Sequence, residues 1–250
     1  MLLNVSDLKG LKIRATDGEI GSVDQFYFDD ETWTIRYLVI NTGNWLTGRM
    51  VLISPISLDN VDVRAKQLDV HLTKKQVENS PNIDTHKPVS RQHEADFLGY
   101  YGYPFYWSGS HLWGPALRPA DLSEGKSGAS ATSKVRQESI DRHLHSTNEV
   151  SGYHIQALDG EVGHVEDFLV DEETWSIRYF VVDTRNWWPG KKVLVSPQWI
   201  ESISWEESKV HVDLARETIK GGPEYDESIP VTREYESKLF DNHGRSGYWF

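Results

Sequence analysis

The chain contains two short acidic runs whose carboxylates could bind a hard cation. Asp29–Glu31 and Asp171–Glu173 each place three carboxylates at consecutive positions, and Ca²⁺ and Mg²⁺ take oxygen ligands. The spacing differs from that of an EF-hand loop, however, and acidic residues are ordinary at solvated hairpin turns. We therefore expect turns at both runs, with no metal and no other cofactor.

Histidine is the usual carrier of acid–base and metal chemistry near neutral pH, and the chain has ten histidines. His143 and His145 form an H-x-H motif, whereas His164 and His211 fall on predicted strands. None of the ten occupies the same position in both copies of an internal repeat whose period is 142 residues. The lack of cysteine removes disulfides, thiolate zinc sites and cysteine nucleophiles. We expect no catalytic residues.

The titratable residues that do match between the two copies have a plainer interpretation. In the first copy they are Asp17, Glu19, Asp29, Glu31, Arg36 and Glu94. We interpret them as turn, cap and surface ion-pair residues, because they form no arrangement of nucleophile, base and orienting group.

Aromatic residues carry a stronger signal, because Trp and Tyr bury large areas at small entropic cost and dominate interface centres. Trp45 lies in a predicted loop, and its counterpart is the run Asn186–Pro189 (NWWP). The dense aromatic tail Tyr100–Trp107 is echoed by Gly247–Phe250. The candidate protein-binding residues are Asn44, Trp45, Asn186, Trp187, Trp188, Tyr101, Tyr106, Trp107, Tyr248 and Trp249.

Two segments of the chain repeat each other in one register. Asp17–Gly21 (DGEIG) recurs 142 residues later as Asp159–Gly163 (DGEVG). The same offset aligns Glu31–Trp33 with Glu173–Trp175 and holds without a gap to the aromatic tails. Such a match over this length indicates one ancestral unit copied in full.

The segments differ in composition and charge. We assign repeat 1 to residues 1–107, a linker to residues 108–143 and repeat 2 to residues 144–250. Within the linker, Leu122–Lys134 (LSEGKSGASATSK) has nothing to pack and predicts a flexible tether. The 250 residues carry a net charge of −12, and residues 149–250 alone hold 20 acidic against 10 basic side chains. This acidity argues against nucleic-acid binding, which needs clustered Lys and Arg.

No apolar run approaches the ~20 residues that cross a bilayer. Met1–Leu3 leads into polar residues and lacks the basic region of a signal peptide. We therefore expect a cytoplasmic protein without a membrane span.

Each repeat contains five or six short predicted strands. Asp17-Gly18 and Asp159-Gly160 predict hairpins with type I′ turns. The run Glu19–Phe28 changes its alternation near Gly21, which predicts a bulge or a barrel corner. Thr34–Ile40 is apolar on both faces towards its end and predicts a central, buried strand.

Short, closely spaced strands without crossover helices predict a mainly β protein of two small antiparallel barrels, each closed so that no long edge is exposed. Lys74–Asn79 predicts a short helix, and Ser90 and Thr232 are N-cap candidates for a second short helix in each tail. Trp33 and Trp175 are expected in the cores.

These motifs resemble the PRC-barrel family. The pattern is G-x-x-I/V-x-A-x-D-G-E-I/V-G-x-V, then D-D/E-E-T-W-x-I-R-Y-x-V-V/I, then P-V-S/T-R-x-x-E, present in both copies. The resemblance implies a compact β-barrel of the kind found in the photosynthetic reaction-centre H subunit and in the ribosome maturation factor, where the barrel docks on other proteins. Without the membrane helix of the first or the RNA-associated domain of the second, the chain is similar to stand-alone bacterial tandem PRC-barrel proteins.

The sequence therefore predicts a non-enzymatic protein-binding or scaffold module of two PRC-barrels. The two repeats are expected to pair within the chain about an approximate two-fold axis, as duplicated units that descend from a homodimer do, and homo-oligomers are a further possibility. Two alternatives stay open: a ribosome or RNA-processing accessory factor, and a metal-dependent or hydrolytic enzyme.

Overall fold

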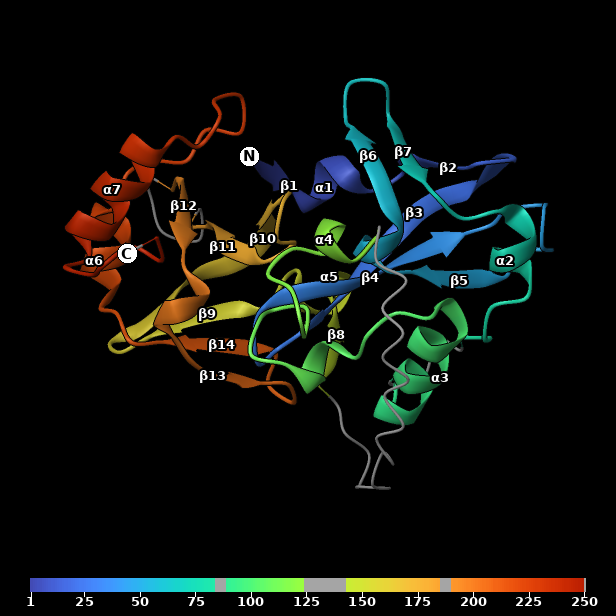
Figure 1. Cartoon of the computed structure of the whole chain (residues 1–250). Helices are drawn as coiled ribbons and strands as arrows, with labels where there is room; N and C mark the ends of the chain where they lie inside the picture. The colour runs from blue at the N-terminus through green and yellow to red at the C-terminus, as the bar shows by residue number, and fades with distance from the viewer. Residues whose placement is uncertain (84–88, 124–142, 185–189, 250) are drawn as a thin grey trace. The chain divides into compact units, whose positions relative to one another are not determined.

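The computed structural model describes residues 1–83, 89–123, 143–184 and 190–249. The chain forms two compact units (Figure 1). Unit 1 consists of Met1, Asp7–Asn148 and Glu172–Ser176, and unit 2 of Leu2–Ser6, Glu149–Asp171 and Ile177–Phe250. Most of the predicted tether lies outside the described residues, as do the candidate residues Asn186, Trp187 and Trp188.

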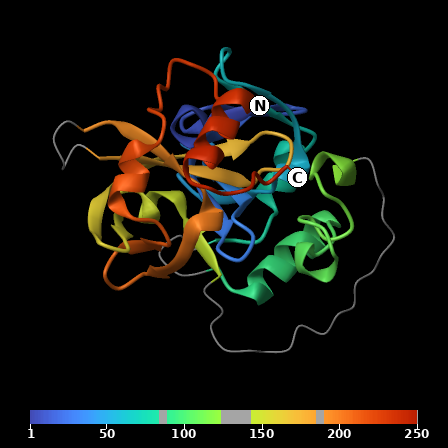
Figure 2. The ribbon, with the colours of Figure 1, turned by 90° about the vertical axis from the view of Figure 1, so that its left-hand side faces the viewer.

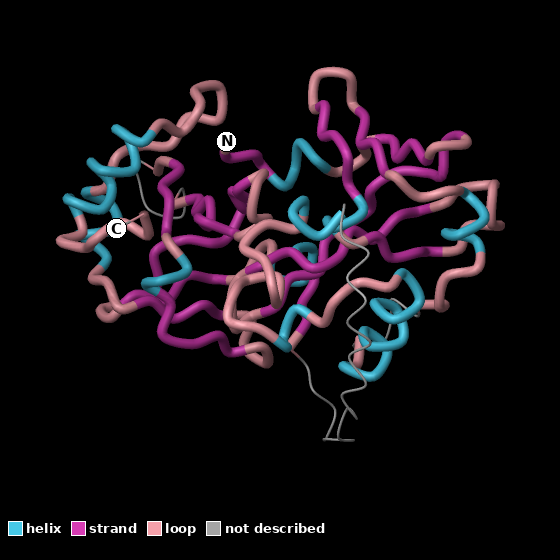
Figure 3. Tube along the Cα trace, in the orientation of Figure 1, coloured by secondary structure: helices cyan, strands magenta, loops and turns pink. Residues whose placement is uncertain are grey.

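Unit 1 is built on one sheet, whose strands are magenta in Figure 3. Its spatial order in the described residues is β5-β4-β3-β2-β7-β6, and β8 pairs with β3 off this path. The strands are β2 (Lys12–Ala15), β3 (Gly18–Asp29), β4 (Thr34–Asn41), β5 (Met50–Ile53), β6 (Leu58–Asp62), β7 (Gln67–Val70) and β8 (Leu144–Ser146).

Unit 2 repeats this topology in the order β12-β11-β10-β9-β14-β13, with β1 paired to β10. Its strands are β1 (Leu2–Asn4), β9 (His154–Ala157), β10 (Gly160–Asp171), β11 (Ile177–Asp183), β12 (Lys192–Val195), β13 (Ile200–Ser204) and β14 (Lys209–Val212). The mainly β class and the tandem repeat predicted from the sequence are confirmed.

The helices are short: α1 and α5 come after the first strand of each repeat, and the others come after its last strand. In unit 2, the helices α6 and α7 are orange-red and red in Figure 2. The α-helices are α1 (Val5–Leu8), α2 (Lys74–Glu78), α3 (Arg91–Tyr101), α4 (Ala120–Ser123), α5 (Thr147–Val150), α6 (Arg216–Gly221) and α7 (Arg233–Asn242), and the 3₁₀ turns are η1 (Pro55–Ser57), η2 (Tyr106–Ser108) and η3 (Pro197–Trp199). Within the described ranges, none of these helices has both the length and the apolar character needed to cross a membrane.

The predicted N-caps are confirmed. The Ser90 side chain accepts a hydrogen bond from the backbone N–H of His93 at the start of α3. The Thr232 side chain accepts one from Tyr235 at the start of α7. Both caps satisfy an amide that would otherwise lack a partner in the first helical turn, so each tail helix starts at a fixed residue.

The bulge predicted in the run Glu19–Phe28 is confirmed. The pairing of β3 with β4 shifts register between Val23 and Gln25 and again between Tyr27 and Phe28. Gly21 is needed at this bend, because a Cβ there would lie 2.1 Å from the carbonyl oxygen of Asn41. Close approach of the two backbones, possible only without a side chain, therefore fixes how β3 crosses β4.

The hairpin between β2 and β3 forms, but its turn differs from the prediction. Ala15 pairs with Gly18, so the two central residues are Thr16 and Asp17 and not Asp17 and Gly18. Neither Thr16 nor Asp17 has the positive φ that a type I′ turn requires. The Asp17 carboxylate instead accepts a 2.7 Å bond from the backbone N–H of Lys74 at the start of α2.

The prediction of closed antiparallel barrels is wrong in two respects. In the described residues, no strand ladder joins β5 to β6, so the path of the sheet stays open. The pairs β2–β7 and β9–β14 are parallel. A 3₁₀ turn at Pro55–Ser57 lies between β5 and β6.

The buried strand predicted at Thr34–Ile40 is confirmed, since every residue of β4 except Asn41 is buried. The two tryptophans expected in the cores differ: Trp175 is buried, whereas Trp33 is half-buried. Both occupy the left-handed region, with φ of 55° and 59°. The same turn geometry is thus preserved in both copies.

The first strand of each repeat belongs to the unit that is built mainly from the other repeat. Strand β1 of repeat 1 pairs antiparallel with β10, with Leu3 opposite Val170. Strand β8 of repeat 2 pairs antiparallel with β3, with His145 opposite Phe28. We call β1 and β8 the exchanged arms. Because the two arms occupy equivalent positions of the repeat, the exchange is reciprocal.

Candidate functional site

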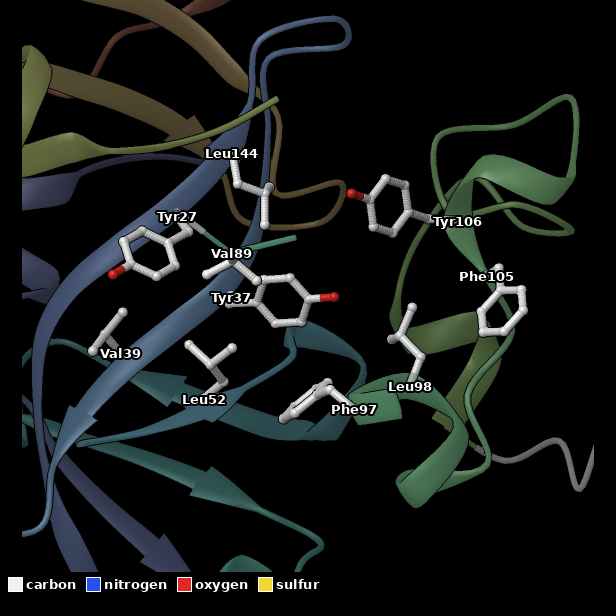
Figure 4. Packing of buried hydrophobic residues seen from close by; sticks show 10 residues of the cluster. All are labelled: Tyr27, Tyr37, Val39, Leu52, Val89, Phe97, Leu98, Phe105, Tyr106 and Leu144. Carbon is white, nitrogen blue, oxygen red and sulfur yellow. The ribbon is translucent and has the colours of Figure 1, made fainter. Parts of the chain in front are cut away.

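The aromatic tail of repeat 1 packs on the sheet of its own unit. Tyr37 on β4 meets Phe97 on α3 edge to face, with ring centroids 5.1 Å apart and an interplanar angle of 87°. Figure 4 shows this cluster, in which tail residues lie over strands β3 to β5. Its buried members are Tyr27, Tyr37, Val39, Leu52, Val89, Phe97, Leu98, Phe105, Tyr106 and Leu144.

A buried carboxylate fixes the tail to the sheet in unit 1. Glu94 on α3 has no exposed surface and accepts hydrogen bonds from the hydroxyls of Tyr106 at 2.7 Å and Tyr37 at 3.1 Å. Arg91 lies 3.5 Å from the same carboxylate. Burial and then the charge of Glu94 raise the pKa of both tyrosines well above the usual value, so both hydroxyls stay protonated and donate.

Unit 2 repeats this arrangement at the equivalent positions. Glu236 on α7 accepts bonds from Tyr179 and Tyr248, each at 2.8 Å, and lies 2.9 Å from Arg233. Burial first, and then the hydrogen bond to Glu236, raise the pKa of Tyr248 to about 12. We call each set the tyrosine–carboxylate latch: Glu94 with Tyr37 and Tyr106, and Glu236 with Tyr179 and Tyr248.

The H-x-H motif supplies one further group to the latch of unit 1. His143 precedes the exchanged arm β8, and its Nε2 lies 2.6 Å from the Glu94 carboxylate and 3.2 Å from the Tyr106 hydroxyl. His145 lies on the arm itself, 3.3 Å from Asp30. The repeat offset pairs His143 with Met1, so repeat 1 has no histidine at the equivalent position.

Asp29 holds the turn before β4, as expected, because its carboxylate accepts the Thr32 N–H, but three of the matched polar residues are not at the surface. Glu94, Asp29 and Arg36 are all buried. The guanidinium of Arg36 donates to Asp29 at 2.5 Å and to the Leu112 carbonyl at 2.6 Å, and it lies 3.9 Å from the centroid of the Tyr106 ring. Each of these buried charged groups is paired and hydrogen-bonded, and these contacts offset the free-energy cost of removing the charge from water.

The latch leaves a tryptophan half-buried at the end of each tail. Trp107 stacks on Phe105 with ring centroids 4.9 Å apart at 8°, and the Arg91 guanidinium lies 4.5 Å from its ring centroid. In unit 2 the guanidinium of Arg233 lies 4.3 Å from the ring centroid of Trp249. We call Arg91 with Trp107, and Arg233 with Trp249, the Arg–Trp pairs. The sequence prediction missed both arginines, although the shared motif P-V-S/T-R contains them.

Trp45 lies in the loop between β4 and β5 and is half-buried, while its neighbour Asn44 is exposed. The ammonium group of Lys74 lies 4.6 Å from the centroid of the Trp45 ring. Tyr100, in the tail helix, donates to the carbonyl of Gln76, so α2 contacts both this loop and the tail. The counterpart of Trp45 in repeat 2 falls outside the described residues.

Tyr101 contributes to the tail but is not freely displayed. It is half-buried, stacks on Tyr103 with centroids 5.6 Å apart at 14°, and contacts Phe97 at 5.0 Å. Burial is the main cause that raises its pKa. Of the predicted tail residues, Tyr106 is buried, whereas Tyr101, Trp107, Tyr248 and Trp249 are half-buried.

The acidic turns use their carboxylates within the protein. Asp29 accepts from Thr32 and Arg36, and Asp171 lies 3.2 Å from Arg178. Across the part of the chain that the structure describes, no group of three or more His, Asp or Glu side chains is arranged to hold a metal ion.

Comparison with known proteins identifies the fold family. The PRC-barrel domain matches residues 2–77 and 146–219, which together make up more than half of the chain. An uncharacterized protein of Deinococcus radiodurans is 35% identical over 86 residues, which cover 34% of this chain and 29% of that relative. The matched region of the chain thus spans less than a third of the length of that relative. On the match of both repeats, the chain belongs to the PRC-barrel domain family.

Proposed function

We propose that the protein is a non-enzymatic binding module that docks on another protein through its Arg–Trp pairs. The observation that carries the proposal is the presence of the same pair, on the same latch, in both units. Tryptophan and arginine are the residues most enriched among those that dominate binding energy. A duplicated surface of this kind suits a scaffold that holds two partner sites.

The latch makes such a surface effective because it holds the tail before a partner arrives. Tyr106 is fixed by Glu94, and Trp107 follows it directly in the sequence. The indole is restrained further by stacking on Phe105. A side chain that is already ordered loses less conformational entropy on binding, so more of its contact energy appears as affinity.

The loop of Trp45 would extend this surface in unit 1. Trp45 is half-buried beneath the ammonium group of Lys74, and α2, which carries Lys74, also contacts the tail helix. We therefore include Asn44 and Trp45 in the proposed surface. Asn186, Trp187 and Trp188 are proposed for the same role in repeat 2 from their sequence positions alone.

Site-specific crosslinking tests the proposal. A photoreactive amino acid is placed at Ser108, which is exposed beside Trp107, and at Arg64, an exposed control position in the turn between β6 and β7. In cells that express the full chain, we expect a discrete crosslinked protein from position 108 that is absent from position 64. The crosslink should disappear when Trp107→Ala is added.

The same experiment separates the alternative of a ribosome or RNA-processing factor. Crosslinked material that carries RNA and is removed by ribonuclease would contradict protein docking and support that alternative. Equal crosslinking with and without Trp107 would show that the Arg–Trp pair is not the binding surface.

A further inference from the structure

Unit 2 contains a cavity of about 260 Å³ beside the start of its tail helix. It is lined by residues 224–226, by residues 229–232 and by the first turns of α7. The backbone holds this wall in place, because Tyr225 donates its N–H to the carbonyl of Lys192 on β12 at 2.8 Å and Glu224 forms a bridge with Val193. The cavity is separate from the Arg–Trp pair proposed as the docking surface, whose residues do not line it.

Two tyrosine rings and an exposed aliphatic side chain form the apolar part of the lining. The hydroxyl of Tyr225 donates to Asn4 at 2.9 Å, and that of Tyr235 donates to the Pro223 carbonyl at 3.1 Å. Both rings are therefore fixed through their polar ends. Ile229, in contrast, is 62% exposed at the cavity.

The polar part of the lining is acidic. Glu224, Asp226 and Glu234 are exposed at the cavity, and Lys238 pairs with Glu234 at 2.7 Å. Hydrogen bonds from Ser228 lower the pKa of Asp226, and the bond from Lys238 lowers that of Glu234. Both carboxylates are ionised at neutral pH, so the rim has a net negative charge.

The other copy of the repeat keeps one of the three acidic residues, with Asp84 at the position of Asp226, but it differs at the other two. The 142-residue offset places Asn82 at the position of Glu224, Gln92 at the position of Glu234 and His93 at the position of Tyr235. At the two positions where repeat 2 has a glutamate, repeat 1 has a polar but uncharged amide side chain. In sequence, the two glutamates and the two tyrosines of the lining are therefore specific to repeat 2.

We propose that this cavity binds a Lys or Arg side chain presented by an apolar segment of a partner protein. Its volume lies below the range of about 300–1,000 Å³ typical of small-molecule sites, so one side chain suits it better than a cofactor. Carboxylates at the rim bind a guanidinium or ammonium group, the tyrosine faces attract the same cation, and Ile229 contacts the apolar flank. The excess of acidic residues in repeat 2 attracts such a segment from solution.

The test uses the full chain and the labelled peptide Gly-Ser-Leu-Arg-Leu-Lys-Leu-Gly-Ser in a fluorescence anisotropy titration. We expect saturable binding that falls about tenfold or more in the double variant Glu224→Asn, Glu234→Gln, because two charge-assisted contacts are lost. The substituted residues are those found in repeat 1, and both positions are exposed, so the fold should be preserved.

The matched control removes the same charge elsewhere in unit 2. Glu201→Gln with Glu206→Gln alters two exposed carboxylates that do not line the cavity, and we expect less than about a twofold change in affinity. An equal loss in this control would overturn the proposal, as would the absence of saturable binding by the wild-type chain. A peptide with glutamate in place of its two basic residues should not bind.

Discussion

The Tyr106 hydroxyl donates a 2.7 Å hydrogen bond to the buried carboxylate of Glu94, which belongs to the helix that starts the same tail. The equivalent bond in unit 2 joins Tyr248 to Glu236 at 2.8 Å. In each unit a second tyrosine, on the central strand, donates to the same carboxylate. The carboxylate thus connects strand, helix and tail, and it positions the tryptophan that follows.

Removal of the carboxylate should destabilise unit 1 strongly. In Glu94→Ala the hydroxyls of Tyr37 and Tyr106 lose their shared acceptor in a buried site, and we expect the free energy of unfolding to fall by about 3 kcal/mol. Urea denaturation followed by circular dichroism measures this change. The control Glu201→Ala, at an exposed position, should change the free energy by less than about 0.5 kcal/mol. A similar small effect for both variants would show that the latch does not stabilise the fold.

Alkaline pH should weaken the latch of unit 2. The pKa of Tyr248 rises from 10.0 to about 12 on folding, so the folded state holds this proton more tightly than the unfolded state. The resulting stabilisation is present in full below about pH 10 and is lost as the pH rises through about 12. Thermal unfolding measured at intervals between pH 9 and pH 12 should show a falling midpoint. The fall should be shallower in Tyr248→Phe, which has no proton to lose, and an identical slope would contradict the role given to this tyrosine.

Glycine at the bend of β3 should be indispensable. In Gly21→Ala the new Cβ meets the Asn41 carbonyl oxygen, 2.1 Å away in the unaltered backbone, and the strands must separate. We expect a loss of about 3 kcal/mol in the free energy of unfolding, measured by urea denaturation. Gly99→Ala is the matched control, since no atom lies within 4 Å of its Cβ position in α3. There alanine should stabilise the helix by about 0.5–1 kcal/mol.

Local patterns along the sequence were sufficient to predict the elements of the fold. The phase change near Gly21, the apolar run of β4 and the two N-caps each depend on neighbouring residues, and all are confirmed. The hairpin turn is displaced by one residue, because Asp17 is used to hold the start of α2. That contact joins residues far apart in the sequence, and no local pattern reports it.

The site depended on non-local contacts and was harder to predict. Glu94 resembles a surface residue of a short polar helix, yet it is buried because two tyrosines and Arg91 surround it. The repeat itself contained the missed signal: Glu94, Tyr37, Tyr106 and Arg91 all match between the copies, whereas no histidine does. A carboxylate, two phenolic hydroxyls and a guanidinium that recur together in both copies are groups that can bind one another, and this pattern points to the latch.

The exchanged arms predict that the two repeats stay bound after the chain is cut between them. Strand β1 supplies an antiparallel partner to β10, and β8 supplies one to β3, so each repeat contributes a hydrogen-bonded strand to the unit built mainly from the other. A protease site placed within residues 124–142 would allow cleavage of the purified full chain. We expect both fragments to co-elute in size-exclusion chromatography. The strand pairing and the burial of Val5 and Leu144 do not depend on an intact linker, so they should hold the fragments together after cleavage. The double variant Val5→Asp, Leu144→Asp should release them after cleavage, whereas separation of the unaltered fragments would contradict the exchange.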